Sequence, residues 1–194
     1  MITILILNWN GRSWLEKFLP SVVDACHDGV EVLVADNGST DDSVSFLQTA
    51  YPQVRVVKHG HNWGFTEGNN RTLPHIKTPY VVLLNSDVEV TPGWLEPLQS
   101  LMDADPKIAA VQPKIRAYND KEHFEYAGAS GGYIDYLGYP FCRGRVFDVL
   151  EKDEGQYDQR EEIFWASGAA LFIRANLYNN IGGFDGDYFA HMEE

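Results

Sequence analysis

A single carboxylate follows an apolar run in the segment from Tyr80 to Asp87, which reads Tyr-Val-Val-Leu-Leu-Asn-Ser-Asp. The run predicts a buried strand, and Asn85, Ser86 and Asp87 form a polar turn after it. In open α/β sheets, ligands bind just outside the carboxyl ends of the strands. An acid there suits Mg²⁺ or Mn²⁺, which take further oxygens from a substrate phosphate. Taken alone, a plain polar turn explains the segment equally well.

Two other predicted strands also end in polar turns. The apolar residues 2–7 lead into Asn8-Trp9-Asn10-Gly11, and residues 31–35 lead into Asp36-Asn37-Gly38-Ser39. In a parallel sheet, such turns can gather on one edge. Asp36 could face a ligand there, or it could form an Asx turn or a helix cap with Gly38.

Strands and helices alternate along the first part of the chain, which predicts an α/β fold: a mostly parallel central sheet with helices on both faces. The expected strands are residues 2–7, 31–35, 54–58, 80–84 and 108–114, and the expected helices are residues 13–25, 40–50, 66–76 and 94–102. Ser13 is the expected cap of the first helix, and Ser39 with Asp42 resembles a capping box for the second. Thr91-Pro92 predicts a helix with proline at its first position.

The pattern changes from about residue 116. Residues 126–145 are rich in Gly and Tyr, residues 148–162 are rich in charge, and neither stretch has helical or strand periodicity. We therefore expect an irregular excursion with one short hairpin, where loops carry specificity. Residues 164–174 predict a return to order, and a short helix follows to about Ile181 before Gly182-Gly183.

Composition limits the function. Hydrophobic residues make up 44% of the 194-residue chain, which is enough for one domain with a real core. The formal net charge of −13 argues against a nucleic-acid partner but not against a nucleotide substrate, whose phosphates a metal can neutralise.

Cys26 and Cys142 form no motif, and their spacing leaves a disulfide open. The short apolar start predicts no signal peptide, so we expect a cytoplasmic protein or domain.

Five segments carry a family resemblance when they are taken in order. They are Asn8-Trp9-Asn10-Gly11, residues 35–41, residues 62–70, Leu84-Asn85-Ser86-Asp87, and Gly182-Gly183-Phe184-Asp185 followed by Glu193-Glu194. Together they resemble the inverting family 2 glycosyltransferases of the GT-A fold, the nucleotide-diphospho-sugar transferase type, and within them the bacterial rhamnosyltransferase-like branch. The resemblance implies a single GT-A catalytic domain over residues 1–194, with a nucleotide-sugar-binding half (1–115) and an acceptor-binding half (116–194). The abrupt end after an aromatic turn predicts that the domain is truncated at its C-terminus.

The resemblance also implies a role for each segment. Asp36 would accept a hydrogen bond from the nucleobase, and Asp87 would bind the metal, with Asn85 in place of the first acid of the family's Asp-x-Asp motif. The remaining nucleotide-sugar-binding residues would be Asn8, Asn10, Gly64, Gly68, Asn69, Asn70, Asn85 and Ser86. Tight turns or packing alone could also explain these glycines and asparagines.

The last motif would carry the chemistry. Glu194 would deprotonate the acceptor hydroxyl, with Glu193 as the second candidate, and a solvated acidic tail is the alternative. Trp165, Ser167 and Gly168 match the segment that borders the donor sugar and acceptor, although a core strand would explain them equally well.

The implied function is transfer of a sugar from a nucleoside-diphosphate sugar, with inversion and with Mg²⁺ or Mn²⁺, in bacterial polysaccharide or cell-surface glycan synthesis. The donor would be dTDP-, UDP- or GDP-linked, and the acceptor a saccharide or a lipid-linked saccharide. The full-length protein could then associate peripherally with the inner face of the cell membrane. One alternative is a nucleotide-sugar-binding domain without catalysis. A nucleotidyltransferase is disfavoured, because Arg12 is the only basic residue near the first turn.

Overall fold

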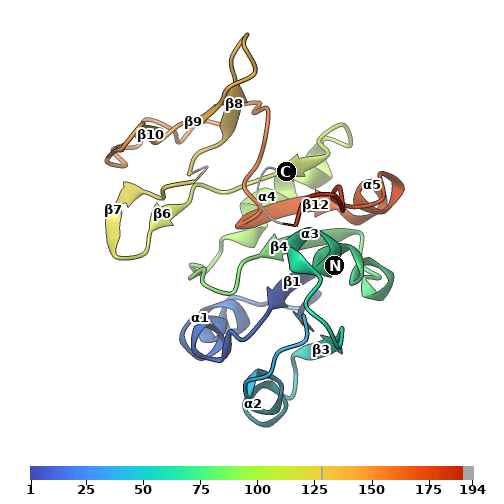
Figure 1. Cartoon of the computed structure of the whole chain (residues 1–194). Helices are drawn as coiled ribbons and strands as arrows, with labels where there is room; N and C mark the ends of the chain where they lie inside the picture. Colours follow the sequence, from blue (N-terminus) through green and yellow to red (C-terminus); the bar gives the residue numbers. More distant parts are fainter. Residues whose placement is uncertain (128, 190–194) are drawn as a thin grey trace.

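The computed structural model describes residues 1–127 and 129–189 and centres on a six-stranded sheet (Figure 1). The strand order is β3-β2-β1-β4-β12-β5. The strands are β1 (Ile2–Asn8), β2 (Val30–Asp36), β3 (Arg55–Lys58), β4 (Tyr80–Leu84), β12 (Ala170–Arg174) and β5 (Ala110–Val111). The α/β class and the mostly parallel sheet predicted from the sequence are confirmed.

One strand departs from the parallel arrangement. β1, β2, β3 and β4 run parallel, whereas β12 pairs antiparallel with β4 on one side and with β5 on the other. β12 therefore occupies the place beside β4 that a simple β-α-β succession would give to β5. The central sheet thus takes strands from both the 1–115 and the 116–194 parts of the chain.

Helices cover both faces of this sheet, as the sequence predicts. They are α1 (Arg12–Asp24), α2 (Ser43–Ala50), α3 (Gly64–Asn70), α4 (Leu95–Ala104) and α5 (Ala175–Asn180), with a 3₁₀ turn, η1 (Leu73–His75). Side chains alternate along a strand, so Ile4 and Ile6 of β1 pack in the core shared with α1, α2 and α4. Leu5 of the same strand packs on the opposite face, against residues of η1 and α5.

Three expected helix starts are wrong. α1 begins at Arg12 after Gly11, and its start has no side-chain cap from Ser13. Ser39 does not cap α2, because its hydroxyl instead accepts a hydrogen bond from the backbone N–H of Asn10 at 2.9 Å. α4 begins at Leu95, so Pro92 precedes the helix rather than opening it. Ser13 thus lies within α1, whereas Ser39 and Thr91-Pro92 belong to the segments before α2 and α4.

The excursion after residue 116 is more ordered than expected. Within the described residues it forms three two-stranded antiparallel ribbons rather than one hairpin. The ribbons are β6 (Arg116–Ala117) with β7 (Asp120–Phe124), β8 (Gly132–Ile134) with β9 (Pro140–Cys142), and β10 (Arg145–Val146) with β11 (Val149–Leu150). These strands are two to five residues long, which is too short for a period of two to be recognised. The expected strand 108–114 likewise shrinks to β5.

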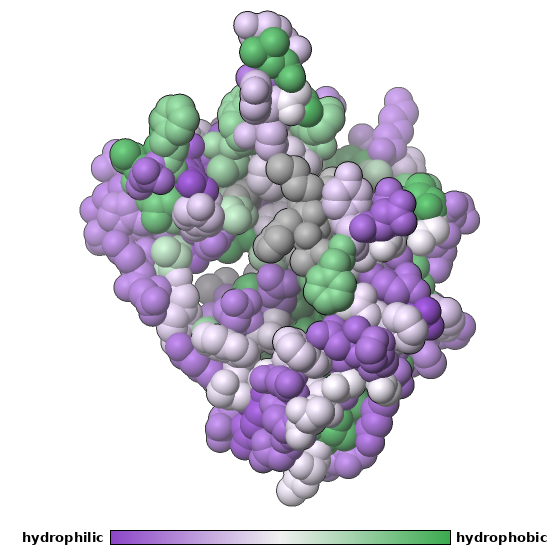
Figure 2. Space-filling view, viewed as in Figure 1, coloured by the Kyte–Doolittle hydropathy of each residue, from purple (hydrophilic) through white to green (hydrophobic). Residues whose placement is uncertain are grey.

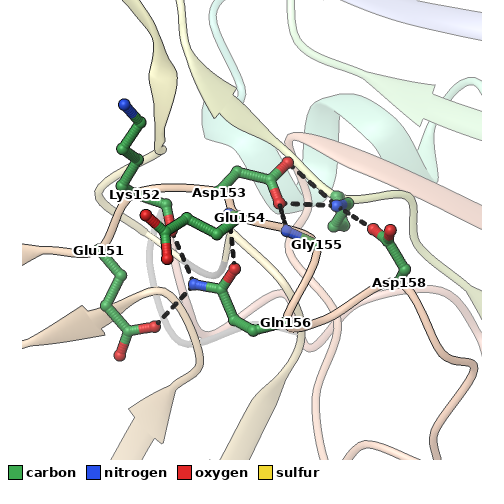
Figure 3. Close-up of polar contacts among 8 residues, drawn as sticks. Glu151, Lys152, Asp153, Glu154, Gly155, Gln156 and Asp158 are labelled. Carbon is green, nitrogen blue, oxygen red and sulfur yellow. Dashed lines mark hydrogen bonds and ion pairs between the residues drawn. The ribbon is translucent and has the colours of Figure 1, made fainter.

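Lys114, which follows β5, forms ion pairs with the segment after residue 116. Its ammonium group lies 2.9 Å from a carboxylate oxygen of Asp153 and 2.5 Å from one of Asp158. Both acids belong to the loop that Figure 3 shows closing on itself. Burial alone would lower the pKa of Lys114, but the hydrogen bonds that its ammonium donates to Asp158 and Asp153 outweigh it and raise that pKa. The Lys114 ammonium lowers the pKa of Asp153 in turn, so the pair is ionised at neutral pH.

Both cysteines are free thiols, so the disulfide that their spacing left open does not form. Of the helices in residues 1–127 and 129–189, not one is long and apolar enough to cross a membrane.

Candidate functional site

The polar turns meet at the carboxyl edge of the parallel strands, as predicted. Asn8 at the end of β1 is the register partner of Asp36 at the end of β2. Ile6 of β1 pairs with Leu84 of β4, so the turn after Leu84 emerges beside the turn after Asn8. The sheet order therefore places the ends of β2, β1 and β4 in sequence along one edge.

Asp36 is a buried carboxylate that is held in position by Asn8 and its own turn. Asn8 donates its amide N–H to Asp36 Oδ1 and to Ser39 Oγ, both at 3.2 Å. The backbone N–H of Ser39 donates to Asp36 Oδ2 at 3.2 Å, which is the Asx-turn contact considered from the sequence, but made with Ser39 rather than Gly38. Each carboxylate oxygen keeps lone pairs for another donor, so the turn orients Asp36 without saturating it.

Asn10 joins the first two turns. It adopts a left-handed backbone conformation with φ of 51°, and its side-chain oxygen accepts a hydrogen bond from the Thr40 N–H at 2.7 Å. Asp41, in the same turn, accepts from the Ser43 hydroxyl at 2.5 Å. Burial alone would raise the pKa of Asp41, but hydrogen bonds from Ser43 and the Arg12 backbone outweigh it and lower that pKa. Asp41 is therefore an engaged structural anion and unsuited to act as a base at neutral pH.

The loop before α3 closes against the second turn through Asn37. The Asn37 amide donates to Asn62 Oδ1 at 3.0 Å and to the Gly64 carbonyl at 2.9 Å, and its oxygen accepts from the Trp63 N–H at 3.2 Å. Gly68 fits tightly, because a Cβ there would lie 3.0 Å from the Asn37 amide nitrogen. The sequence reasoning missed Asn37, although its place directly after Asp36 was a usable signal.

The candidates at the other end of α3 have structural partners. Asn69 is buried and donates to the Phe65 carbonyl at 2.8 Å. Asn70 binds the backbone of Phe184 twice, by donating to its carbonyl at 2.8 Å and by accepting from its N–H at 2.9 Å. The Gly-Gly-Phe-Asp segment is thereby fixed to α3, and the Phe65 N–H donates to the Phe189 carbonyl at 2.8 Å further on. Glu193 and Glu194 lie outside the described residues.

The turn after β4 meets the segment before β12. The Asn85 N–H donates to the Ala169 carbonyl at 3.1 Å, which brings Ser167 and Gly168 to the same edge as Ser86. Ser167 is buried, and its N–H donates to Gln112 Oε1 at 2.7 Å. No local pattern in the sequence indicated Gln112, because its role depends on a contact 55 residues away along the chain.

Trp165 joins this edge to the excursion. Its indole N–H donates to the Tyr133 carbonyl at 3.1 Å. The ring lies directly over Gly132, where a Cβ would come within 1.8 Å of it. Trp165 is half-buried in this contact, whereas the neighbouring Phe164 is exposed.

Asp87 is exposed and bonds to no other residue in the described part of the chain. The two side chains before it in the sequence, the Asn85 amide and the Ser86 hydroxyl, each carry an oxygen that can bind a cation. A Cβ on Gly11 would lie 2.4 Å from Asn8 Oδ1 and 3.9 Å from Ser86 Oγ, so both oxygens lie beside Gly11. Asn8 Oδ1 is a buried acceptor without a hydrogen-bond partner in the described residues.

This donor set fits a hard cation such as Mg²⁺ or Mn²⁺. The described residues contain no cluster of three or more His, Cys, Asp or Glu side chains that could hold a metal by themselves. A cation at Asp87 would therefore depend on water and on oxygens of a bound phosphate to complete its coordination.

A family model described as glycosyl transferase family 2 matches residues 3–182. The chain belongs to glycosyl transferase family 2. The family, the GT-A fold and the rhamnosyltransferase-like resemblance predicted from the five segments are confirmed.

Two curated members of family 2 from Mycobacterium tuberculosis illustrate the relationship. N-acetylglucosaminyl-diphospho-decaprenol L-rhamnosyltransferase is 29% identical over 212 residues, which cover 100% of this chain and 68% of the relative. Pre-mycofactocin glycosyltransferase is 27% identical over 195 residues, which cover 95% of this chain and 35% of the relative.

Solved structures share the fold. The mannosyltransferase PcManGT from Pyrobaculum calidifontis, in complex with GDP-Man and Mn²⁺, superposes with a TM-score of 0.65 at 19% identity, covering 96% of this chain and 48% of that one. S. aureus TarS 1–349 in complex with UDP-GlcNAc gives a TM-score of 0.66 at 15% identity, covering 95% and 48%. The family 2 chain described here thus spans about half the length of these structures.

Proposed function

We propose that this family 2 chain transfers a sugar from a nucleoside-diphosphate sugar to a saccharide or lipid-linked saccharide, with inversion, in bacterial polysaccharide or cell-surface glycan synthesis. The order of polar groups along the sheet edge carries the proposal. Asp36 ends β2, Asn8 ends β1, Asn85–Asp87 follow β4, and Ser167–Gly168 precede β12. Three strand spacings of roughly 4.8 Å separate the first from the last, about 14 Å in all. That distance suits a base, a diphosphate and a sugar laid out in this order.

Each group then has a role that its chemistry supports. Asp36, oriented by Asn8, would accept the ring N–H of the nucleobase. Asn85, Ser86 and Asp87 would border the diphosphate. A divalent cation held by Asp87 would supply electrostatic stabilisation of the charge that develops on the leaving group.

The sugar and its acceptor would lie toward β12. Ser167, Gly168 and Trp165 would border them, and Glu194 or Glu193 would take the proton of the attacking hydroxyl. Attack on the face opposite the diphosphate inverts the anomeric centre. The Asn70 contact with Phe184 supports this arrangement, since it holds the Gly-Gly-Phe-Asp part of the same motif against α3.

For the donor we propose a dTDP-linked sugar such as dTDP-rhamnose, because a relative aligned over the whole chain is a rhamnosyltransferase. UDP- and GDP-linked sugars are the alternative donors, and the thermal-shift test compares the three bases. We place the reaction in the cytoplasm, at the inner face of the membrane when the acceptor is lipid-linked.

Thermal shift with each nucleoside diphosphate and Mn²⁺ tests the base and the metal together. The largest stabilisation is expected from dTDP, and only when metal is present.

Asp87→Ala tests the function itself. Asp87 is exposed and unpaired, so its loss should leave folding intact and lower metal-dependent transfer by about 100-fold or more. Glu89→Ala is the matched control, because Glu89 lies two residues away and pairs with Lys121 at 2.6 Å. Its activity should stay within about twofold of the parent. Equal metal-dependent transfer by the Asp87→Ala and parent proteins would refute the assignment.

A nucleotide-sugar-binding domain without catalysis is the second candidate, because the chain spans only about half the length of the solved structures. Calorimetry that finds tight, metal-dependent nucleotide binding, with no turnover in this chain or in a longer one, would favour this candidate.

A further inference from the structure

The ribbons β8–β9 and β10–β11 carry an unusual number of exposed apolar side chains, and we call residues 132–150 the aromatic ribbon. Figure 2 shows hydrophobic surface on the hairpin that protrudes at the top and on the neighbouring part of the molecule. Tyr136 is 93% exposed and Phe147 is 87% exposed. Large apolar side chains gathered on protruding tips mark an interaction surface, whereas singly scattered ones do not.

Side-chain and backbone hydrogen bonds order the turn at the tip between β8 and β9. Asp135 accepts hydrogen bonds from the N–H groups of Leu137 and Tyr139 at 2.8 and 2.9 Å. The backbone closes the same turn through Asp135 and Tyr139 at 3.0 Å. The carboxylate is thereby occupied beneath the tip, while Tyr136, Leu137 and Tyr139 project outward with exposed fractions of 93%, 65% and 67%.

The second tip displays Phe147 at a conformational cost. Its φ of 50° lies in the left-handed region, which is unfavourable for a non-glycine residue. Arg145 holds the turn by donating to the Phe147 carbonyl and by packing 3.7 Å from the ring centroid of Tyr126. The turn thus leaves the Phe147 ring in solvent despite an unfavourable backbone conformation.

Charge distinguishes the aromatic ribbon from the rest of the protein. It contains two acids, Asp135 and Asp148, and two bases, Arg143 and Arg145, so its formal charge is zero, against −13 for the whole chain. Arg143 also pairs with Glu161 at 2.7 Å. An acidic protein is repelled by an anionic lipid surface, and a neutral apolar projection is the part that can approach it.

The base of the aromatic ribbon adjoins the candidate sugar and acceptor segment. The Gly132 N–H donates to the Trp165 carbonyl at 3.0 Å, and the Phe164 N–H donates to the Gly132 carbonyl at 2.8 Å. Whatever the tips contact is therefore linked through short, hydrogen-bonded strands to Trp165. With a lipid-linked acceptor, the tips would contact the lipid end of the substrate, and the Trp165 segment would contact its sugar end.

We propose that the aromatic ribbon docks on the interfacial zone of a lipid membrane, with Tyr136, Leu137, Tyr139 and Phe147 as the inserting side chains. Tyrosine favours this zone, because its ring is apolar and its hydroxyl stays hydrated. Docking would hold the Trp165 segment near the headgroups, where the sugar of a lipid-linked acceptor is presented. This last step rests on the proposed function, whereas docking itself does not.

Vesicle flotation with the purified 194-residue chain tests the inference. The parent protein should float with phosphatidylcholine vesicles at low and at high salt, and less with vesicles that contain 30 mol% phosphatidylglycerol at low salt, because insertion is apolar and the protein is acidic. Leu137→Ser should lower the partition coefficient on the order of tenfold. Ile181→Ser is the matched control: Ile181 is 73% exposed against 65% for Leu137, but it follows α5, outside the aromatic ribbon.

The opposite results would overturn docking. They are a parent chain that floats with neither vesicle, or equal losses for Leu137→Ser and Ile181→Ser. Self-association in sedimentation velocity that Leu137→Ser abolishes would also overturn it, by making a second copy the partner. A transfer assay with a water-soluble acceptor separates the two proposals: transfer without flotation defeats docking alone, and flotation without transfer defeats the proposed function alone.

Discussion

Gly38 provides a sharp test of how the nucleotide edge is built. Its φ is +78°, and a Cβ there would lie 2.7–2.8 Å from three backbone atoms of His61. Gly60 has nearly the same backbone, with φ of +69°, but a Cβ there would meet nothing within 4 Å. The pair therefore separates the cost of the left-handed conformation from the cost of the close approach between the two loops.

The expected magnitudes follow from this difference. Gly60→Ala should lower the free energy of unfolding by about 1 kcal/mol, the cost of placing alanine in the left-handed region. Gly38→Ala should add about 1–3 kcal/mol of overpacking, because a backbone segment cannot move aside as a side chain can. The difference should lower the melting temperature of Gly38→Ala by a further 2–4 °C or so per kcal/mol.

Urea unfolding of both variants measures the stability difference, and calorimetry with a nucleoside diphosphate and Mn²⁺ measures its effect on the site. Gly38→Ala should also weaken nucleotide binding, because separating the loops disturbs the contacts of Asn37 with the Trp63–Gly64 segment. Gly60→Ala should bind as the parent does. Equal losses of stability in the two variants would show that the loops do not approach as closely as described, and would refute the reasoning.

Three further predictions concern the frame around the site. Arg174 donates to three backbone carbonyls near the end of α4, so Arg174→Gln should cost about 2–4 kcal/mol in urea unfolding; a loss below 1 kcal/mol would contradict this. Burial lowers the pKa of His59, whose Nε2 lies 3.0 Å from Thr72 Oγ1. The unfolded state therefore takes up the proton first, and stability should fall as pH drops below about 6.5; His59→Gln should flatten that slope, and an unchanged slope would exclude His59 as its source. Asn70→Ala should speed amide exchange at Phe184 at least about fivefold, the equivalent of one hydrogen bond; unchanged exchange would show that Asn70 does not hold the segment.

Local patterns were sufficient for the parallel half of the sheet. The apolar runs that became β1, β2 and β4 were predicted to within a residue or two, because each is buried on both faces and ends in a polar turn. The same reasoning placed Asp36 and Asp87 at strand ends, and the common edge followed from the parallel order alone. The start of α2 was wrong because Ser39 had two uses, as a cap or as a turn partner, and only its contact with Asn10 decides between them.

The sequence alone therefore determined the fold class, the family and the group of strand-end residues that could meet a nucleotide sugar. Only the tertiary structure decided what lies next to them. It placed β12 antiparallel between β4 and β5, and it joined Ser167 to Gln112 and Asn70 to Phe184. The reason is physical: burial and turn preference act over a few neighbouring residues and leave periodic patterns, whereas these pairings join residues 55 to 114 positions apart, where complementarity leaves no local pattern.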